Sequence, residues 1–318
     1  RAGVGNDVLS ISPSVRQNAR PQSGFPDLRF RSKHVPEPIS VSDRLSILNG
    51  PQREAVTTLS GPLLVLAGAG TGKTRVITYR MAELIRSGVA PDRILSVTFT
   101  NKAAKEMLER TRHLLGGGMK ARPWISTFHS LCVNVLRSDI EVLGYPRRFT
   151  ILDRGDQESI ARGVLRDIRV TESSLRPGDL LSIISRWKSV GIRPDRAKDA
   201  AEDDKEFLAA MAYRKYQAKL KSTGGVDFDD LLLLVVRLFK EHPEALARWR
   251  HRFRHVLVDE FQDTNLAQWE IVRMLAEEHR TVMGVGDADQ AIYKFRGADY
   301  RNLLRFEEAF PELSTIIL

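Results

Sequence analysis

Short apolar runs alternate with longer amphipathic segments in the chain after residue 45. Leu63–Leu66 and Ile94–Val97 are apolar runs of strand length, and a third strand opens at Trp124. Helical patterns of ten or more residues follow the first two runs, at Thr74–Arg86 and Lys102–Leu115. Because strands that alternate with helices of this length form parallel sheets, the pattern predicts an α/β fold with helices on both faces of the sheet.

This alternation stops in the middle of the chain and then returns. Residues 131 to about 223 are almost wholly helical and rich in Arg, Lys and Glu, apart from the strand-like run Phe149–Leu152. After Gly225, strand-like runs recur at Val256–Val258 and Thr281–Val285. The simplest account is one α/β domain that is interrupted by an all-helical insertion.

The pattern predicts four divisions of the chain. They are a flexible basic arm at 1–42, the first part of the α/β domain at 43–130, the helical subdomain at 131–225 and the second part of the α/β domain at 226–318. The arm contains five prolines, and its six Lys or Arg outnumber three Asp or Glu. Such a stretch buries too little surface to offset its ordering entropy. Its composition leaves open whether it is a linker or the remnant of an organelle-targeting segment.

Charge and cysteine content narrow the functional classes. The net charge of +9 favours a polyanionic partner, because Lys and Arg gain free energy by displacing the counterions of phosphates. No run of eighteen apolar residues occurs, so the sequence predicts no membrane span. The one cysteine, Cys132, excludes an internal disulfide and a Cys-rich zinc site. Its apolar neighbours predict a small buried side chain rather than a reactive thiol.

A glycine-rich segment, Ala67–Thr74, lies between the first predicted strand and helix, where a phosphate-binding loop would lie. Its backbone amides and the following helix N-terminus would surround the β-phosphate of ATP. Lys73 would reach the β- and γ-phosphates, and the Thr74 hydroxyl would ligate Mg²⁺. The expected nucleotide-binding residues are Gly68, Ala69, Gly70, Thr71, Gly72, Lys73 and Thr74. The alternative is a glycine-rich turn without a ligand.

Two carboxylates follow the apolar run Val256–Val258. Asp259 would hold magnesium through its water shell, and Glu260 would orient and deprotonate the attacking water. A solvated loop is the alternative interpretation of this pair.

The strand-like run Thr281–Val285 leads to a glutamine and then to a cluster of aromatic residues. Gln290 could bond the γ-phosphate, and Tyr293, Phe295 and Arg296 follow within seven residues. Aromatic rings stack with bases irrespective of sequence, and arginine adds phosphate or stacking contacts. Taken alone, such an aromatic cluster more often belongs to a protein core than to a DNA-binding surface.

Asp259–Asn265 and Val285–Asp299 resemble the second and third motifs of UvrD/Rep/PcrA-type superfamily 1 helicases. Further segments resemble other motifs of this family in the right order, namely Leu48–Gln52, Thr98–Ala104, Thr127–Ser130 and Val226–Leu231. The resemblance covers residues 43 to 318. It implies a RecA-like P-loop domain with an inserted helical subdomain, which uses ATP and Mg²⁺ and travels 3′ to 5′ on single-stranded DNA.

The resemblance also assigns expected contacts. Gln52 would read the adenine edge and Arg75 would lie against the adenine. The residues expected along the DNA strand are Phe99, Thr100, Asn101, His129, Tyr293, Phe295 and Arg296. Family members often carry Trp where this chain has Phe295. The other expected DNA partner is a junction of single and double strands, in the cytoplasm or nucleoid, a nucleus or an organelle.

The resemblance further implies a second RecA-like motor domain of the parent protein. Both ends of this chain read as cut, because it opens on Arg1 and closes on the strand-like Ser314–Leu318. We therefore expect the domain that supplies the catalytic arginine to lie past Leu318, where a fused nuclease would also lie. A DNA- or protein-binding module without motor activity, and another P-loop enzyme such as a small-molecule kinase, are the competing hypotheses.

Several residues have a plainer interpretation. Phe99 could belong to the core, and His129 could be a polar residue satisfied within the fold. The basic runs Arg248–Arg254 and Tyr213–Lys221 could contact nucleic acid, but they more simply form solvated helix faces. Asp227, Asp229 and Asp230 favour a helix N-terminus over a metal site.

Overall fold

The computed structural model describes residues 45–116, 121–287 and 301–318. The chain divides into two compact units, residues 1–44 and Leu45–Leu318, and the fold described below is that of the second unit. The predicted arm, residues 1–42, lies outside the described residues. Gln290, Tyr293, Phe295 and Arg296 also lie outside them.

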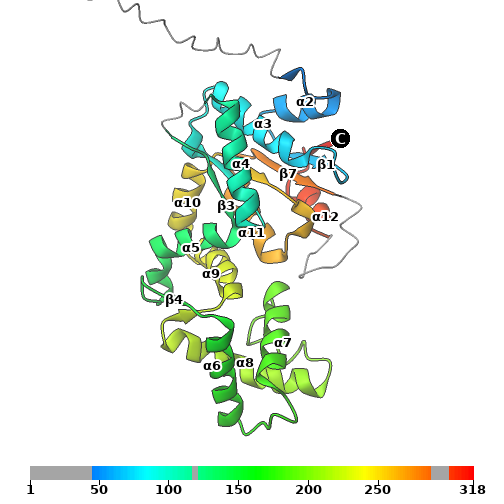
Figure 1. Cartoon of the computed structure of the whole chain (residues 1–318). Helices are drawn as coiled ribbons and strands as arrows, with labels where there is room; N and C mark the ends of the chain where they lie inside the picture. The colour runs from blue at the N-terminus through cyan, green and yellow to red at the C-terminus, as the bar shows by residue number, and fades with distance from the viewer. Residues whose placement is uncertain (1–44, 117–120, 288–300) are drawn as a thin grey trace, which may run out of the picture. The chain divides into compact units, whose positions relative to one another are not determined.

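A six-stranded parallel sheet forms the centre of this unit. Figure 1 shows helices packed around this sheet. Its strands are β1 (Leu63–Leu66), β2 (Ile94–Thr98), β3 (Trp124–Thr127), β6 (His255–Val258), β7 (Val282–Gly286) and β8 (Ser314–Ile317). The spatial order is β3-β2-β6-β7-β1-β8, and every neighbouring pair is parallel. The predicted strands are therefore confirmed to within one or two residues at each end.

Helices follow the strands of the sheet in sequence and fill the middle of the chain. They are α2 (Gly50–Thr57), α3 (Lys73–Arg86), α4 (Asn101–Leu114), α5 (Phe128–Asp139), α6 (Arg154–Asp167), α7 (Pro177–Ser189), α8 (Asp204–Ser222), α9 (Phe228–Glu241), α10 (Pro243–Arg252), α11 (Leu266–Ala276) and α12 (Arg301–Ala309). A two-stranded parallel sheet joins β4 (Thr150–Ile151) to β5 (Gly225–Val226).

Both faces of the large sheet are covered, as the sequence predicts. In β1, Leu63 and Val65 point to a core shared with α2, α3 and α4, whereas Leu64 points to the opposite core. That second core contains buried residues of α5, α9, α10, α11 and α12. Successive side chains of a strand face opposite ways, so strands that are apolar throughout can stabilise both layers.

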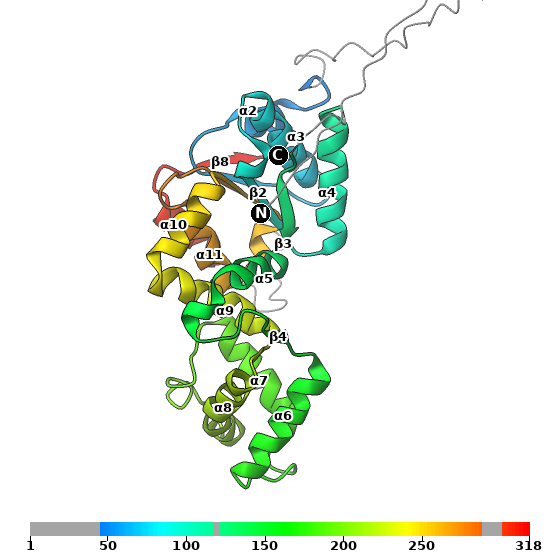
Figure 2. The ribbon, with the colours of Figure 1, turned by 90° about the vertical axis from the view of Figure 1, so that its left-hand side faces the viewer.

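The helices α6, α7 and α8 have a core of their own and lie together away from the large sheet (Figure 2). Its buried members come from residues 161–220. By contrast, α5 and α9 contribute to the core that covers the sheet. The helical insertion is thus present, while the divisions at residues 131 and 225 remain predictions.

Cys132 takes the buried position that the sequence predicts, and two arginines of the basic run Arg248–Arg254 form ion pairs. Cys132 is buried, and burial raises the pKa of its thiol. Arg248 pairs with Asp139, and Arg250 pairs with Glu277 at 3.0 Å. These arginines therefore have acidic partners within the fold. No helix in the described part of the chain combines the length and hydropathy needed to cross a membrane.

Two histidines near the amino ends of β6 and β7 should make stability depend on pH. Burial, followed by the positive charge of nearby arginines, lowers the pKa of His255 to about 4, and burial and Arg254 lower that of His279 to about 4. Between pH 6.5 and 4, both histidines are protonated in the unfolded chain but remain uncharged in the folded chain. The free energy of unfolding therefore decreases as pH falls through this range. We expect His255→Gln/His279→Gln to flatten this dependence in urea titrations. An equally steep decline in the double variant would contradict the assignment.

Candidate nucleotide and nucleic-acid sites

Three neighbouring strands, β6, β7 and β1, end side by side at the carboxyl edge of the sheet. In parallel sheets the loops at this edge form the usual ligand sites. The predicted phosphate loop follows β1, and the predicted acidic pair follows β6. Asp287, which the sequence had not marked, follows β7 between them.

The glycine-rich loop after β1 requires glycine at two positions of its backbone. Gly70 and Gly72 adopt positive φ angles of 78° and 99°, a region that other residues rarely occupy. A Cβ atom at Gly72 would lie 2.9 Å from the Nε2 atom of Gln52. The Ala67 amide donates to the Gly286 carbonyl at 2.9 Å, which ties the start of the loop to β7. Gly68, Ala69 and Thr71 complete the loop, and Thr71 donates its hydroxyl to the Gly68 carbonyl.

Lys73, the first residue of α3, lies between two carboxylates. Its Nζ atom is 3.1 Å from Glu260 Oε2 and 3.5 Å from Asp287 Oδ2. The Lys73 side chain is 11% exposed, so these ion pairs are only partly screened by water. The structure thus brings the lysine of the loop together with the second carboxylate of the acidic pair.

Asp259 has the properties of a cation ligand. It is buried, and its Oδ2 atom accepts a hydrogen bond from the Thr98 hydroxyl at 3.2 Å. Its Oδ1 atom is also buried but accepts no hydrogen bond from the residues that the structure describes. Burial, followed by the charge of Glu260, raises the pKa of Asp259 to about 6. A divalent cation would supply both the missing partner and the missing positive charge.

Asp259 and Thr74 suit a Mg²⁺ ion that has few protein ligands, rather than an ion that is enclosed by protein side chains. Across the described residues, no three His, Cys, Asp or Glu side chains gather in a way that could hold a metal ion. Thr74, next to Lys73, is the other predicted ligand. Mg²⁺ commonly takes one or two protein ligands and completes its shell with water and phosphate oxygens, and these residues fit that pattern.

Sequence reasoning missed Gln262, which holds the acidic pair in place. Glu260 has a left-handed backbone with φ 48°, an uncommon conformation for a residue other than glycine. The Gln262 amide donates to Glu260 Oε2 at 2.9 Å and accepts from the Asp287 backbone amide at 2.9 Å. A Cβ atom at Gly286 would lie 2.8 Å from Gln262 Oε1. The only signal in the sequence was a polar residue two positions after the acidic pair.

The two residues expected at the adenine have different environments. Gln52 is buried, and its Nε2 atom donates to the Thr71 carbonyl at 2.8 Å, so its amide contacts the phosphate loop directly. Its Oε1 atom accepts from the Asn49 amide in the capping box of α2. Arg75 is exposed on the first turn of α3. Their contacts with adenine remain predictions.

A groove of about 690 Å³ lies beside this region, at the carboxyl ends of β2 and β3. Phe99 and His129, both predicted to contact DNA, line it together with Phe228. The His129 and Phe228 rings lie 5.5 Å apart, and Phe228 is 55% exposed. Burial lowers the pKa of His129, which favours its uncharged form. The groove therefore combines exposed ring faces with an uncharged imidazole.

Phe99 lies between the core and the groove, and its contact with DNA remains a prediction. Its ring packs against Phe128 of the core at 5.8 Å, yet it also lines the groove. Thr100 caps α4 by accepting a hydrogen bond from the Ala103 amide, and Asn101 begins that helix with an exposed side chain. Phe228 was missed, because it stood out only as an aromatic residue at a helix start between aspartates.

Comparisons with known proteins agree with this arrangement. A family model described as the UvrD/REP helicase N-terminal domain matches residues 48–311. The chain is 45% identical over 275 residues to a protein of Bacillus subtilis strain 168 named ATP-dependent DNA helicase PcrA, covering 86% of this chain and 37% of that protein. Proteins with the same name from Staphylococcus epidermidis and Leuconostoc citreum are 44% and 43% identical, covering 85% and 88% of this chain and 37% and 38% of theirs.

The chain spans little more than a third of the length of these relatives. The family match covers both parts of the sheet and the helical insertion between them. The predicted fold class, a RecA-like parallel sheet with an inserted helical subdomain, is confirmed. The chain belongs to the UvrD/REP helicase N-terminal domain family.

Proposed function

We propose that this chain is the ATP-binding half of an ATP-dependent DNA helicase that moves 3′ to 5′ on single-stranded DNA in repair or replication. The observation that carries the proposal is the shared edge of the sheet. Lys73, Asp259 and Glu260 lie at the ends of β1 and β6, and the groove lies at the ends of β2 and β3. The names of the relatives support the same activity.

In the proposed nucleotide site, the loop amides from Gly68 to Gly72 bind the β-phosphate, and Lys73 neutralises the β- and γ-phosphates. Lys73 leaves its carboxylate partners for the phosphates, which frees Glu260 to accept a proton from the attacking water. Thr74 and Asp259 would hold Mg²⁺, which neutralises phosphate charge when bound. Gln290 would bond the γ-phosphate.

In the proposed DNA site, bases stack on aromatic rings without regard to sequence. Phe99, His129 and Phe228 form the described part of this site. Tyr293, Phe295 and Arg296 would extend it, and Thr100 and Asn101 would contact the backbone from the start of α4. The proposed substrate is single-stranded DNA next to a duplex junction, inside the cell.

A second RecA-like domain of the parent protein is the proposed partner of the nucleotide site. Arginine fingers raise phosphoryl-transfer rates by about 10³–10⁵. The 318-residue polypeptide alone should therefore bind nucleotide and single-stranded DNA weakly, with little hydrolysis and no unwinding. Robust DNA-stimulated hydrolysis by this polypeptide would contradict that expectation.

Paired titrations with nucleotide and with a labelled oligonucleotide test the proposal. Lys73→Ala should lose affinity for nucleotide and keep affinity for the oligonucleotide. Phe295→Ala should lose affinity for the oligonucleotide and keep affinity for nucleotide. A polypeptide that binds nucleotide but no oligonucleotide would favour another P-loop enzyme. One that binds oligonucleotide but no nucleotide would favour a binding module without a motor.

Phe99→Ala should weaken oligonucleotide binding by about 1–3 kcal/mol, the usual contribution of one stacked base. Nucleotide affinity should stay within about twofold, because the Phe99 ring packs against Phe128 and lines the groove, away from the Lys73 ion pairs. Fluorescence anisotropy measures the first quantity. Phe207→Ala, which removes a 49% exposed ring from α8, is the matched control. Equal oligonucleotide affinity of Phe99→Ala and Phe207→Ala would contradict the proposal that the groove binds DNA.

A further inference from the structure

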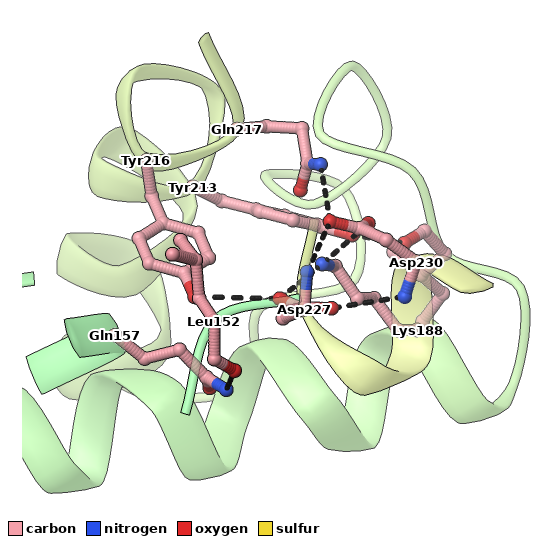
Figure 3. Close-up of polar contacts among 9 residues, drawn as sticks. Leu152, Gln157, Lys188, Tyr213, Tyr216, Gln217, Asp227 and Asp230 are labelled. Carbon is pink, nitrogen blue, oxygen red and sulfur yellow. Dashed lines mark hydrogen bonds and ion pairs between the residues drawn. The ribbon is translucent and has the colours of Figure 1, made fainter. Parts of the chain in front are cut away.

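A buried ion cluster joins the helical insertion to the start of α9 (Figure 3). Lys188 of α7 is 2% exposed, and its Nζ atom donates to Asp227 Oδ2 at 2.6 Å and to Asp230 Oδ1 at 2.7 Å. The same two aspartates form the capping box of α9, in which each side chain accepts from the other residue's amide. The predicted helix-capping role of these aspartates is confirmed. They have a second role as the hydrogen-bond acceptors of Lys188.

The helix α8 completes this cluster. The Tyr216 hydroxyl donates to Asp227 Oδ2 at 3.3 Å, and Gln217 Nε2 donates to Asp230 Oδ2 at 2.9 Å. Both tyrosine and glutamine come from the insertion, whereas the aspartates belong to the segment that returns to the sheet. Residues of α7, α8 and the start of α9 thus meet in one hydrogen-bonded cluster.

Charges in this position fix geometry more strictly than an apolar contact would. Burial acts against the charged form of Lys188, but the two carboxylates outweigh it and raise the pKa of the lysine above its ordinary value. Charge-assisted hydrogen bonds are short and directional, and a buried charge without its partners is costly. The helices α7 and α9 therefore cannot slide past each other without breaking these bonds.

The residues next to the cluster form one wall of the groove. On α7, Ser185 and Ser189 lie three residues before and one residue after Lys188, and both line the groove. On α9, Phe228 follows Asp227 directly and also lines it. Phe99 lines the same groove from the end of β2. The cluster thus sets the spacing of side chains that face the groove.

We propose that Lys188 is a positioning residue for DNA binding, which fixes α7 against the first turn of α9 and so holds Phe228 in the groove that Phe99 also lines. The proposal rests on the proposed function, in which this groove holds single-stranded DNA. Lys188 itself touches no DNA in this arrangement.

Two variants separate positioning from simple stabilisation. Lys188→Met removes the ammonium and leaves two buried carboxylates without it, so the melting temperature should fall. Lys188→Met/Asp230→Asn removes one of those charges, keeps a side-chain oxygen for the Asp227 amide and should recover much of the stability. The tie between α7 and α9 stays absent in both variants.

The readouts are melting temperature, affinity for fluorescent ATP and affinity for a fluorescein-labelled oligothymidylate. In the double variant, oligonucleotide affinity should fall about 5- to 150-fold, equivalent to one lost stacking contact, while nucleotide affinity stays within about twofold. A double variant that recovers both stability and oligonucleotide affinity would overturn the proposal. Nucleotide affinity that falls in parallel with DNA affinity would also overturn it.

A DNA-free readout separates this proposal from the proposed function. Spin labels at Val190→Cys, at the end of α7, and at Lys102→Cys, on the first turn of α4, lie at exposed positions and report the distance between these two helices, and Cys132 is too buried to react. The distance distribution should shift or broaden in the double variant. An unchanged distribution would overturn the role of Lys188. Failure of the unsubstituted chain to bind oligothymidylate, with a shifted distribution in the variant, would instead overturn the DNA assignment alone.

Discussion

Replacement of Lys73 by alanine is expected to weaken binding of Mg–ATP about 100-fold. A hydrogen bond to a charged group contributes about 1.5–3 kcal/mol, and Lys73 would make such bonds to two phosphates. The loss is moderated because the ammonium must first leave Glu260 and Asp287, to which it is already paired. Fluorescence titration with a labelled ATP analogue measures the change.

A matched control removes a positive charge elsewhere. Lys105 lies on the exposed face of α4, so Lys105→Ala changes net charge equally and should leave nucleotide affinity within about twofold. Oligonucleotide affinity should be retained in Lys73→Ala. Comparable loss of nucleotide in both variants would show that general charge, rather than this lysine, attracts the nucleotide.

Replacement of Trp269 by alanine is expected to lower the free energy of unfolding by about 3–5 kcal/mol, the usual cost of removing a large aromatic side chain from a core. Trp269 of α11 is 1% exposed, and its ring lies 5.7 Å from Phe261 and 5.5 Å from Phe306. A cavity there would also loosen Phe261, which directly follows the left-handed residue Glu260.

Urea titration followed by circular dichroism measures this loss. Phe207→Ala removes an aromatic ring that is 49% exposed and should change the free energy of unfolding by less than about 0.5 kcal/mol. A loss below about 1 kcal/mol in Trp269→Ala would mean that α11 and α12 close over the cavity.

The elements that the sequence predicted well are those whose signals are local. The phosphate loop lies between an apolar run and a helix, and Asp259 follows another apolar run, so a few adjacent residues were enough. The strand order was different. Nothing in the local pattern indicated that β7 would lie between β1 and β6, because that order depends on how the whole chain crosses over.

The missed residues depend on contacts between distant segments. Lys188 and Asp227 are separated by 39 positions, and in sequence Lys188 is one cation among many on a basic helical stretch. Phe228 and His129 likewise meet only after α5 and α9 pack together. Gln262 was a neighbour of predicted residues, but its role needed the backbone of β7 beside it.

The end of strand β2 has a mechanical consequence. Thr98 holds Asp259 through its hydroxyl, and the next residue, Phe99, faces the groove. A base that displaced the Phe99 ring would act on the residue that directly follows the one bearing this hydroxyl. Binding of nucleic acid in the groove and binding of a cation at Asp259 would then be coupled through two adjacent residues, Thr98 and Phe99. Such coupling would not require a long chain of contacts through the protein interior.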